Sequence, residues 1–123
     1  MTVSTLLDAA ARAFAMVSLA DGALTPSEEH RFARFAAAEP TLKSATRDDV
    51  RLAWGQAVKD VKGSPSFGGP LLAIRQEVDA LEEKAVVMRA AQTALVADSK
   101  LEPQENTAIR VLAEALALDP DRY

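Results

Sequence analysis

A nine-residue segment occurs twice in this chain, and the repeat constrains the fold more than any other feature. Residues 20–28 read ADGALTPSE and residues 97–105 read ADSKLEPQE, at an offset of 77 residues. Ala, Asp, Leu, Pro and Glu recur at the same five places. Each copy follows an apolar helical run and opens another. The sequence therefore predicts two helix–loop–helix units that carry a matched set of acidic residues.

Apolar spacing and capping residues predict a helix on each side of the first copy. Apolar residues at helical spacing predict a helix over about 3–20, and Gly22 is expected to end it as the left-handed residue of a C-cap. Thr25 as N-cap, Pro26 at the first helical position and Glu28 at N3 then start a second helix with a capping box. We expect that helix to end near residues 39–40.

The rest of the chain also has helical periodicity. Thr46 opens a third helix, residues 63–70 are loop-like, and a helix from about Leu71 leads to a new start that Asp79 caps with Glu82. An Asp-Pro pair at residues 119–120 is expected to stop the last helix. No run with a period of two calls for a strand. We therefore expect an all-α, single-domain helical bundle of about six to seven helices with two pseudo-repeated helix–loop–helix units.

Length, charge and composition exclude several classes of protein. A chain of 123 residues is enough for one domain with one core. A net charge of −4 argues against broad nucleic-acid binding. The lack of cysteine excludes disulfides and thiolate metal sites. No apolar stretch is long enough to span a membrane, and the N-terminus lacks the basic region of a signal peptide, so we expect a cytoplasmic location.

The paired motifs resemble the TerB-like family, all-α domains named for bacterial tellurite-resistance proteins. The family pattern is an apolar helix that ends in Ala-Asp-Gly, a short linker with an aliphatic residue, and a Glu that opens the next helix. Residues 20–28 follow it with Leu24 as the aliphatic residue, and residues 97–105 follow it with Leu101. The second copy departs from the pattern at Ser99, where the family prefers Gly, and a Ser with a positive φ would cost ~1 kcal/mol.

The resemblance implies one TerB-like domain over residues 1–123. Its repeat units would be about 3–39 and 80–118, bridged by 46–79. It also implies a non-enzymatic protein of a bacterial stress or tellurite-resistance type, in which acidic residues of this kind have been proposed to bind metal.

The repeated acidic residues are the candidate metal ligands: Asp21 and Glu28 in the first copy, and Asp98 and Glu105 in the second. The spacing matches the second half of an EF-hand loop, in which an acidic residue precedes a Gly and a Glu closes the site. The first half is absent, because residues 17 and 19 are Val and Leu. One copy supplies three or four oxygens at most, so a full site needs water or both loops together. Oxygen ligands suit calcium, magnesium or manganese.

The alternative is that these acidic residues are helix caps. Glu28 and Glu105 would then stabilise the positive N-termini of the helices they open. Asp21 and Asp98 oppose the dipole in the last turn of a helix, so each needs a partner. That partner is a backbone Asx-turn, an arginine such as Arg12 or Arg31, or a cation.

The remaining singled-out residues point to structure rather than chemistry. His30 is the single histidine and is expected to face solvent, and Trp54 is expected in the core or at an interface. Leu24 and Leu101 are expected to be core residues that hold the two loops together. No nucleophile elbow and no phosphate-binding Gly-rich loop is present, so we expect no enzyme activity and no required cofactor. The alternative function is a pure protein-interaction module. The sequence is consistent with a protein partner and with a homodimer.

Overall fold

The computed structural model describes residues 3–20, 26–63, 68–78, 80–97 and 103–118. These residues form α-helices and one short 3-10 helix, and none of them lies in a strand. The all-α prediction is therefore confirmed for this part of the chain. The pseudo-symmetry of the two repeat units stays a prediction. In chain order the elements are α1 (Val3–Ala20), α2 (Pro26–Ala38), η1 (Pro40–Leu42), α3 (Arg47–Lys62), α4 (Gly68–Glu77), α5 (Leu81–Ala97) and α6 (Pro103–Ala115).

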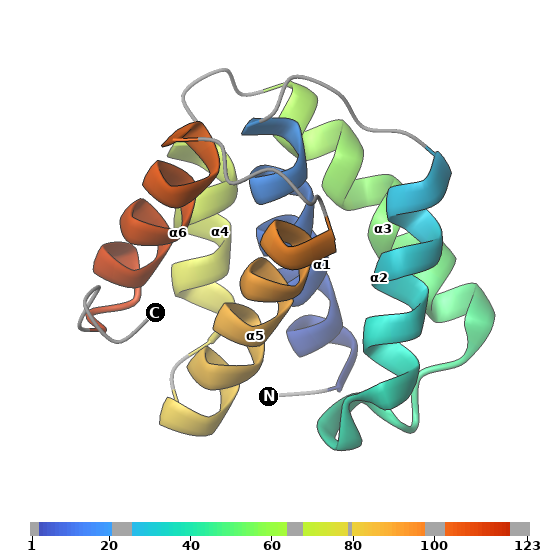
Figure 1. Cartoon of the computed structure of the whole chain (residues 1–123). Helices are drawn as coiled ribbons and strands as arrows, with labels where there is room; N and C mark the ends of the chain where they lie inside the picture. The colour runs from blue at the N-terminus through green and yellow to red at the C-terminus, as the bar shows by residue number, and fades with distance from the viewer. Residues whose placement is uncertain (1–2, 21–25, 64–67, 79, 98–102, 119–123) are drawn as a thin grey trace.

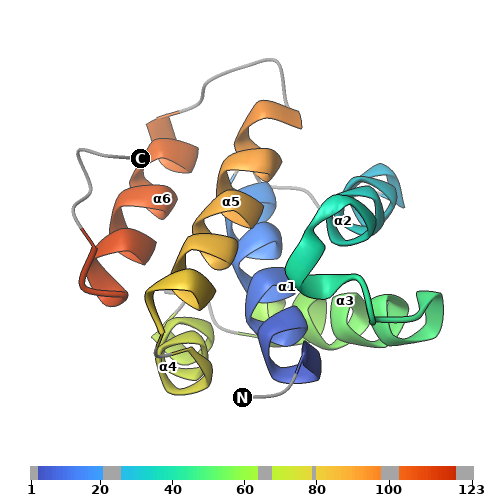
Figure 2. The same ribbon diagram turned by 90° about the horizontal axis from the view of Figure 1, so that it is seen from below.

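Helix α1 lies at the centre of the bundle. Seen from below, α5 and α4 lie on one side of it and α2 and α3 on the other, with α6 outermost beyond α5 (Figure 2). Its most extensive packing is against α5 and α3. A helix that is apolar on all sides is buried on all sides. The buried residues of α1 are Leu6, Leu7, Ala9, Ala10, Ala11, Ala13, Phe14, Ala15, Met16, Val17 and Ser18.

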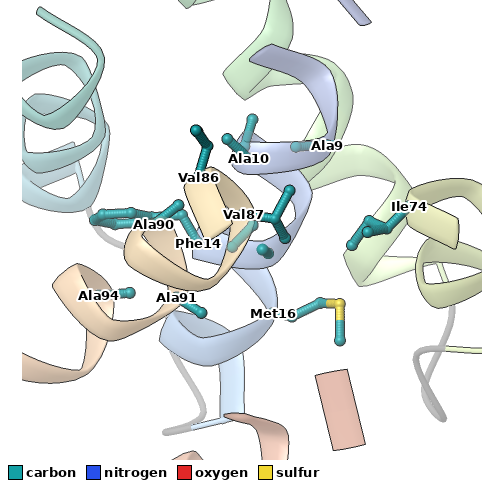
Figure 3. Packing of buried hydrophobic residues seen from close by; sticks show 14 of the residues in the cluster. Ala9, Ala10, Phe14, Met16, Ile74, Val86, Val87, Ala90, Ala91 and Ala94 are labelled. Carbon is teal, nitrogen blue, oxygen red and sulfur yellow. The ribbon is translucent and has the colours of Figure 1, made fainter. Parts of the chain in front are cut away.

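Small residues let α5 approach α1 closely. Val86, Val87, Ala90, Ala91 and Ala94 of α5 are buried and lie around the central helix (Figure 3). The distance between packed helices depends on the side chains at the contact, so alanine on both sides permits a short one.

Three aromatic rings join α1, α2 and α3 on the other side of the central helix. The ring centroid of Phe14 lies 5.6 Å from that of Phe32 and 5.7 Å from that of Trp54, both in edge-to-face geometry. The rings of Phe32 and Trp54 stack at 5.4 Å. Such pairs contribute about 0.5–1.5 kcal/mol beyond the area they bury. The prediction of a core or interface position for Trp54 is confirmed, since it is buried in the core.

Local capping sets several helix starts. At α3 the Thr46 hydroxyl accepts from the Asp49 N–H at 3.1 Å, and the Asp49 carboxylate accepts from the Thr46 N–H at 2.9 Å. This capping box confirms the predicted start of α3. At α5 the Ala80 N–H donates to the Glu83 carboxylate at 3.0 Å. The sequence predicted that Asp79 and Glu82 would cap this helix start. The prediction was wrong for Glu82, because Glu83 accepts the capping hydrogen bond, and Asp79 lies outside the described residues.

Helix α4 differs from the sequence prediction at its start. It begins at Gly68 rather than near Leu71, because a proline in the first turn of a helix loses no hydrogen bond. Ile74 and Val78 face the core, whereas Leu72 is 54% exposed.

The last helix also ends earlier than the predicted stop at residues 119–120. Ala117 has a φ of 57°. The Leu118 N–H donates to the Ala113 carbonyl at 2.8 Å, and the Ala117 N–H donates to the Glu114 carbonyl at 3.0 Å. This pair of bonds is a Schellman motif, which ends α6 at Ala115 without a glycine.

Across the described ranges, no helix combines the length and the apolar content needed to cross a membrane.

Candidate functional site

One of the four predicted metal ligands has a described side chain. Glu28 lies in the first turn of α2 and is half-buried. Asp21 and Asp98 lie outside the described residues, as do Gly22, Leu24, Ser99 and Leu101. Glu105 belongs to α6, but its side chain is not described. Within the described part of the chain, no three acidic or histidine side chains group in a way that could hold a metal ion.

The four helix ends that flank the two repeated segments lie at the same end of the bundle. Helices α1 and α5 both run upward in Figure 1, and α2 and α6 both start at the top. The C-terminal ends at Ala20 and Ala97 therefore point in the same direction as each other. The arrangement of these helices is compatible with both acidic segments acting at one end of the fold.

The N-terminus of α2 is acidic, as the capping alternative requires. Glu28 and Glu29 lie in the first turn of α2, where the helix dipole favours negative charge. Pro26 begins the helix, as predicted. Thr25, the predicted N-cap, lies outside the described residues, so the capping box at this helix stays a prediction.

Arg12, one of the two arginines suggested as partners for Asp21 and Asp98, is engaged at another place. Arg12 of α1 donates from Nε to Asp60 Oδ2 of α3 at 3.3 Å and from Nη1 to Glu77 Oε1 of α4. Its side chain is 13% exposed, against 34% for Asp60 and 20% for Glu77. The pair of bonds fixes three helices around one guanidinium.

Burial and charge shift the pKa values in this network in a consistent way. Burial raises the pKa of Glu77; Arg12 opposes the shift, and the nearby carboxylates of Asp8 and Asp60 add to it. Burial likewise raises the pKa of Asp8. Burial would lower the pKa of Arg12, but its bonds to Glu77 and Asp60 outweigh that effect and raise it. Arg12 therefore interacts with three carboxylates, those of Asp8, Asp60 and Glu77. The acidic groups of this network outnumber its one basic group.

Another ion pair joins the end of α2 to α5. Glu39 is buried, with 7% of its side chain exposed, and accepts from Arg89 Nε at 3.0 Å and Arg89 Nη2 at 2.8 Å. The Thr41 hydroxyl also donates to it at 3.2 Å. The hydrogen bond from Arg89 lowers the pKa of Glu39, and burial opposes this. Sequence reasoning missed these ion pairs, although isolated charges in an apolar helix such as α1 do signal the need for a buried partner.

The described surface is hollowed beside α2. A groove of about 740 Å³ lies between α2, η1 and the start of α3, which are neighbours in Figure 1. Its floor is apolar and its rim is mostly basic. His30, exposed as predicted, stands on the rim. The lining residues are Glu29, His30, Ala33, Arg34, Ala36, Ala37, Leu42, Lys43, Ala45, Thr46, Arg47, Asp48, Val50 and Arg51.

The family of the chain follows from a match over almost all of its length. A family model described as "Tellurite resistance protein TerB" matches residues 7–123. The chain belongs to this family. The match includes every described helix, with α1 entering it at Leu7, and it confirms the resemblance drawn from the repeated segments. No curated protein and no solved structure matches the chain.

Proposed function

We propose that this TerB-family chain is a non-enzymatic domain of a bacterial stress or tellurite response that binds a divalent cation. The proposed ligands are Asp21, Glu28, Asp98 and Glu105. The observation that supports the proposal is the common direction of the helices: α1 and α5 end, and α2 and α6 begin, at one end of the bundle. The proposal is that the carboxylates of the two loops bind the ion together at that end.

The donor chemistry favours a hard cation. Four carboxylates and loop carbonyls are oxygen ligands, which suit calcium, magnesium or manganese rather than copper or zinc. One copy of the motif has too few oxygens for calcium, which takes six to eight. The proposal therefore needs both copies, and it puts the first copy ahead of the second because the second has Ser99 in place of Gly.

The proposed ligands would bind and orient the ion without catalysing a reaction. Glu28 is held in place by the first turn of α2. A negative side chain at this place interacts favourably with the positive N-terminus of the helix. The ion would then join the end of α1 to the start of α2 and the end of α5 to the start of α6, so binding should stabilise the fold by mass action.

Calorimetric titration with calcium, magnesium and manganese tests the proposal. We expect the wild-type chain to bind at least one of these ions and the Asp21→Asn/Asp98→Asn variant to lose that binding. The matched control is Glu82→Gln/Glu114→Gln, which removes the same charge from two exposed positions and should bind as the wild type does.

The opposite result would favour the other function. If the wild-type chain takes up none of the three ions at millimolar concentration, or if the control loses binding as fully as the loop variant, the metal proposal is overturned. The chain would then be an interaction module whose acidic loop residues act as helix caps.

A further inference from the structure

The basic residues on the rim of the groove beside α2 have no described partners. Arg34 is on α2, Lys43 follows η1, and Arg47 and Arg51 are one turn apart on α3. All four are exposed. In the described part of the chain, no hydrogen bond or ion pair engages their side chains. They differ in this from Arg12 and Arg89, whose guanidinium groups are held by carboxylates.

This surface is positive although the chain is negative. The groove is lined by four arginine and lysine residues and two acidic residues, so its lining has a net charge of +2. The whole chain has a net charge of −4, which leaves −6 for the rest of it. Positive charge concentrated around a concave surface attracts a negative ligand and raises its rate of association.

The floor of the groove limits what that ligand can be. Its apolar lining residues are Ala33, Ala36 and Ala37 of α2, Leu42 of η1, and Ala45 and Val50 from the segment where α3 begins. Small side chains let the backbone of a bound helix approach closely. None of the lining residues is Phe, Tyr or Trp, and His30 supplies the one imidazole ring, whereas single-stranded nucleic acid is held by stacking of successive bases on aromatic side chains. A peptide with an apolar face fits this floor better than a nucleic acid does.

We propose that the groove between α2 and α3 binds an acidic amphipathic helix of a partner protein. The apolar face of that helix would lie on the alanine floor, and its Asp and Glu side chains would pair with Arg34, Lys43, Arg47 and Arg51. This is the helix-in-groove mode of recognition, with electrostatic complementarity setting the choice of partner. The proposal is independent of the metal site, because none of the four proposed metal ligands lines the groove.

Selection from a display library of amphipathic helical peptides, with random charges beside a fixed apolar stripe, tests this proposal on the full chain. We expect the selected peptides to be rich in Asp and Glu next to the stripe. The Arg47→Glu/Arg51→Glu variant should lose affinity for them by about tenfold or more and should instead select Lys and Arg. Negative side chains near the start of α3 suit its helix dipole, so this variant should fold.

A matched control separates the groove from net charge. Lys59→Glu/Arg75→Glu makes the same change in charge at exposed positions outside the groove and should select and bind peptides as the wild type does. Lys43→Glu/Arg51→Glu is the second groove variant if the first does not fold by circular dichroism. The proposal is overturned if the wild type enriches no acidic peptides or if both charge reversals weaken binding equally. Tighter binding of a labelled oligothymidine than of any selected peptide would also overturn it.

Discussion

Removing the half-exposed partner of the Glu39–Arg89 pair should destabilise the protein more than removing the buried partner. Arg89→Ala leaves Glu39, with 7% of its side chain exposed, without its two guanidinium bonds. Glu39→Gln leaves Arg89, whose side chain is 51% exposed and can be solvated by water. A buried charge without its partner costs several kcal/mol, whereas an exposed one costs little.

The magnitudes follow from the geometry. We expect Arg89→Ala to lower the free energy of unfolding by about 2 kcal/mol, which is less than the roughly 3–5 kcal/mol for a fully buried pair, because water can enter where the guanidinium was. We expect Glu39→Gln to cost about 1 kcal/mol, the value of a hydrogen bond to a charged group reduced by the solvation of Arg89. The double variant should be more stable than Arg89→Ala alone, since it contains no unpaired buried charge.

Urea unfolding measures the free energy of unfolding of the wild type, the two single variants and the double variant. The fluorescence of Trp54, the single tryptophan of the chain, follows the transition. The dependence of the free energy of unfolding on pH is a second test. Because the pKa of Glu39 is lowered in the fold, the stabilisation is present above the unfolded pKa and is lost as the pH falls through the folded value. The difference between wild type and Arg89→Ala should therefore shrink below about pH 4. The reasoning is refuted if Glu39→Gln costs more than Arg89→Ala, or if the double variant is the least stable of the set.

Three further predictions concern single positions. Glu77→Gln should be at least as stable as the wild type at pH 7, because burial raises the pKa of Glu77 and disfavours its charged form. The two proteins should converge as the pH falls towards the unfolded pKa, and a loss above about 1 kcal/mol at pH 7 would contradict this. Ala117→Gly should raise the free energy of unfolding by about 0.5–1 kcal/mol, because it relieves a φ of 57°; a lower unfolding midpoint in urea would show that the left-handed residue is not strained. Glu28→Ala should cost about 0.5–2 kcal/mol without metal, and the difference from wild type should widen as manganese is added. A thermal-shift difference that is independent of metal would identify Glu28 as a cap alone.

The features that sequence predicted well depend on neighbouring residues. The bounds of α1, the start of α2 at Pro26 and the capping box of α3 at Thr46 are all fixed within a few residues of the chain. The end of α6 was predicted too late because an alanine adopts the left-handed conformation at Ala117, where a glycine would have been the signal.

The ion pairs could not be predicted in the same way, because they join residues far apart in the sequence. Arg12 is 48 residues from Asp60 and 65 from Glu77, and Arg89 is 50 from Glu39. Periodicity identifies the face on which a side chain lies but not the helix it meets. The burial of α1 on all sides had a signal in the sequence, since Asp8 and Arg12 are its only charged residues. The basic groove beside α2 depends on how α2 packs against α3, and no spacing rule gives that angle.

The central claim is that both acidic segments hold one divalent ion, and paramagnetic broadening by manganese tests it most directly. Amide resonances of the isotope-labelled chain would be followed as substoichiometric manganese is added, with magnesium as the diamagnetic reference. We predict selective broadening of residues 21–28 and 98–105 together, and its loss in Asp21→Asn/Asp98→Asn. Broadening of one segment without the other, or weak broadening spread over the exposed acidic residues of all helices, would contradict a shared site.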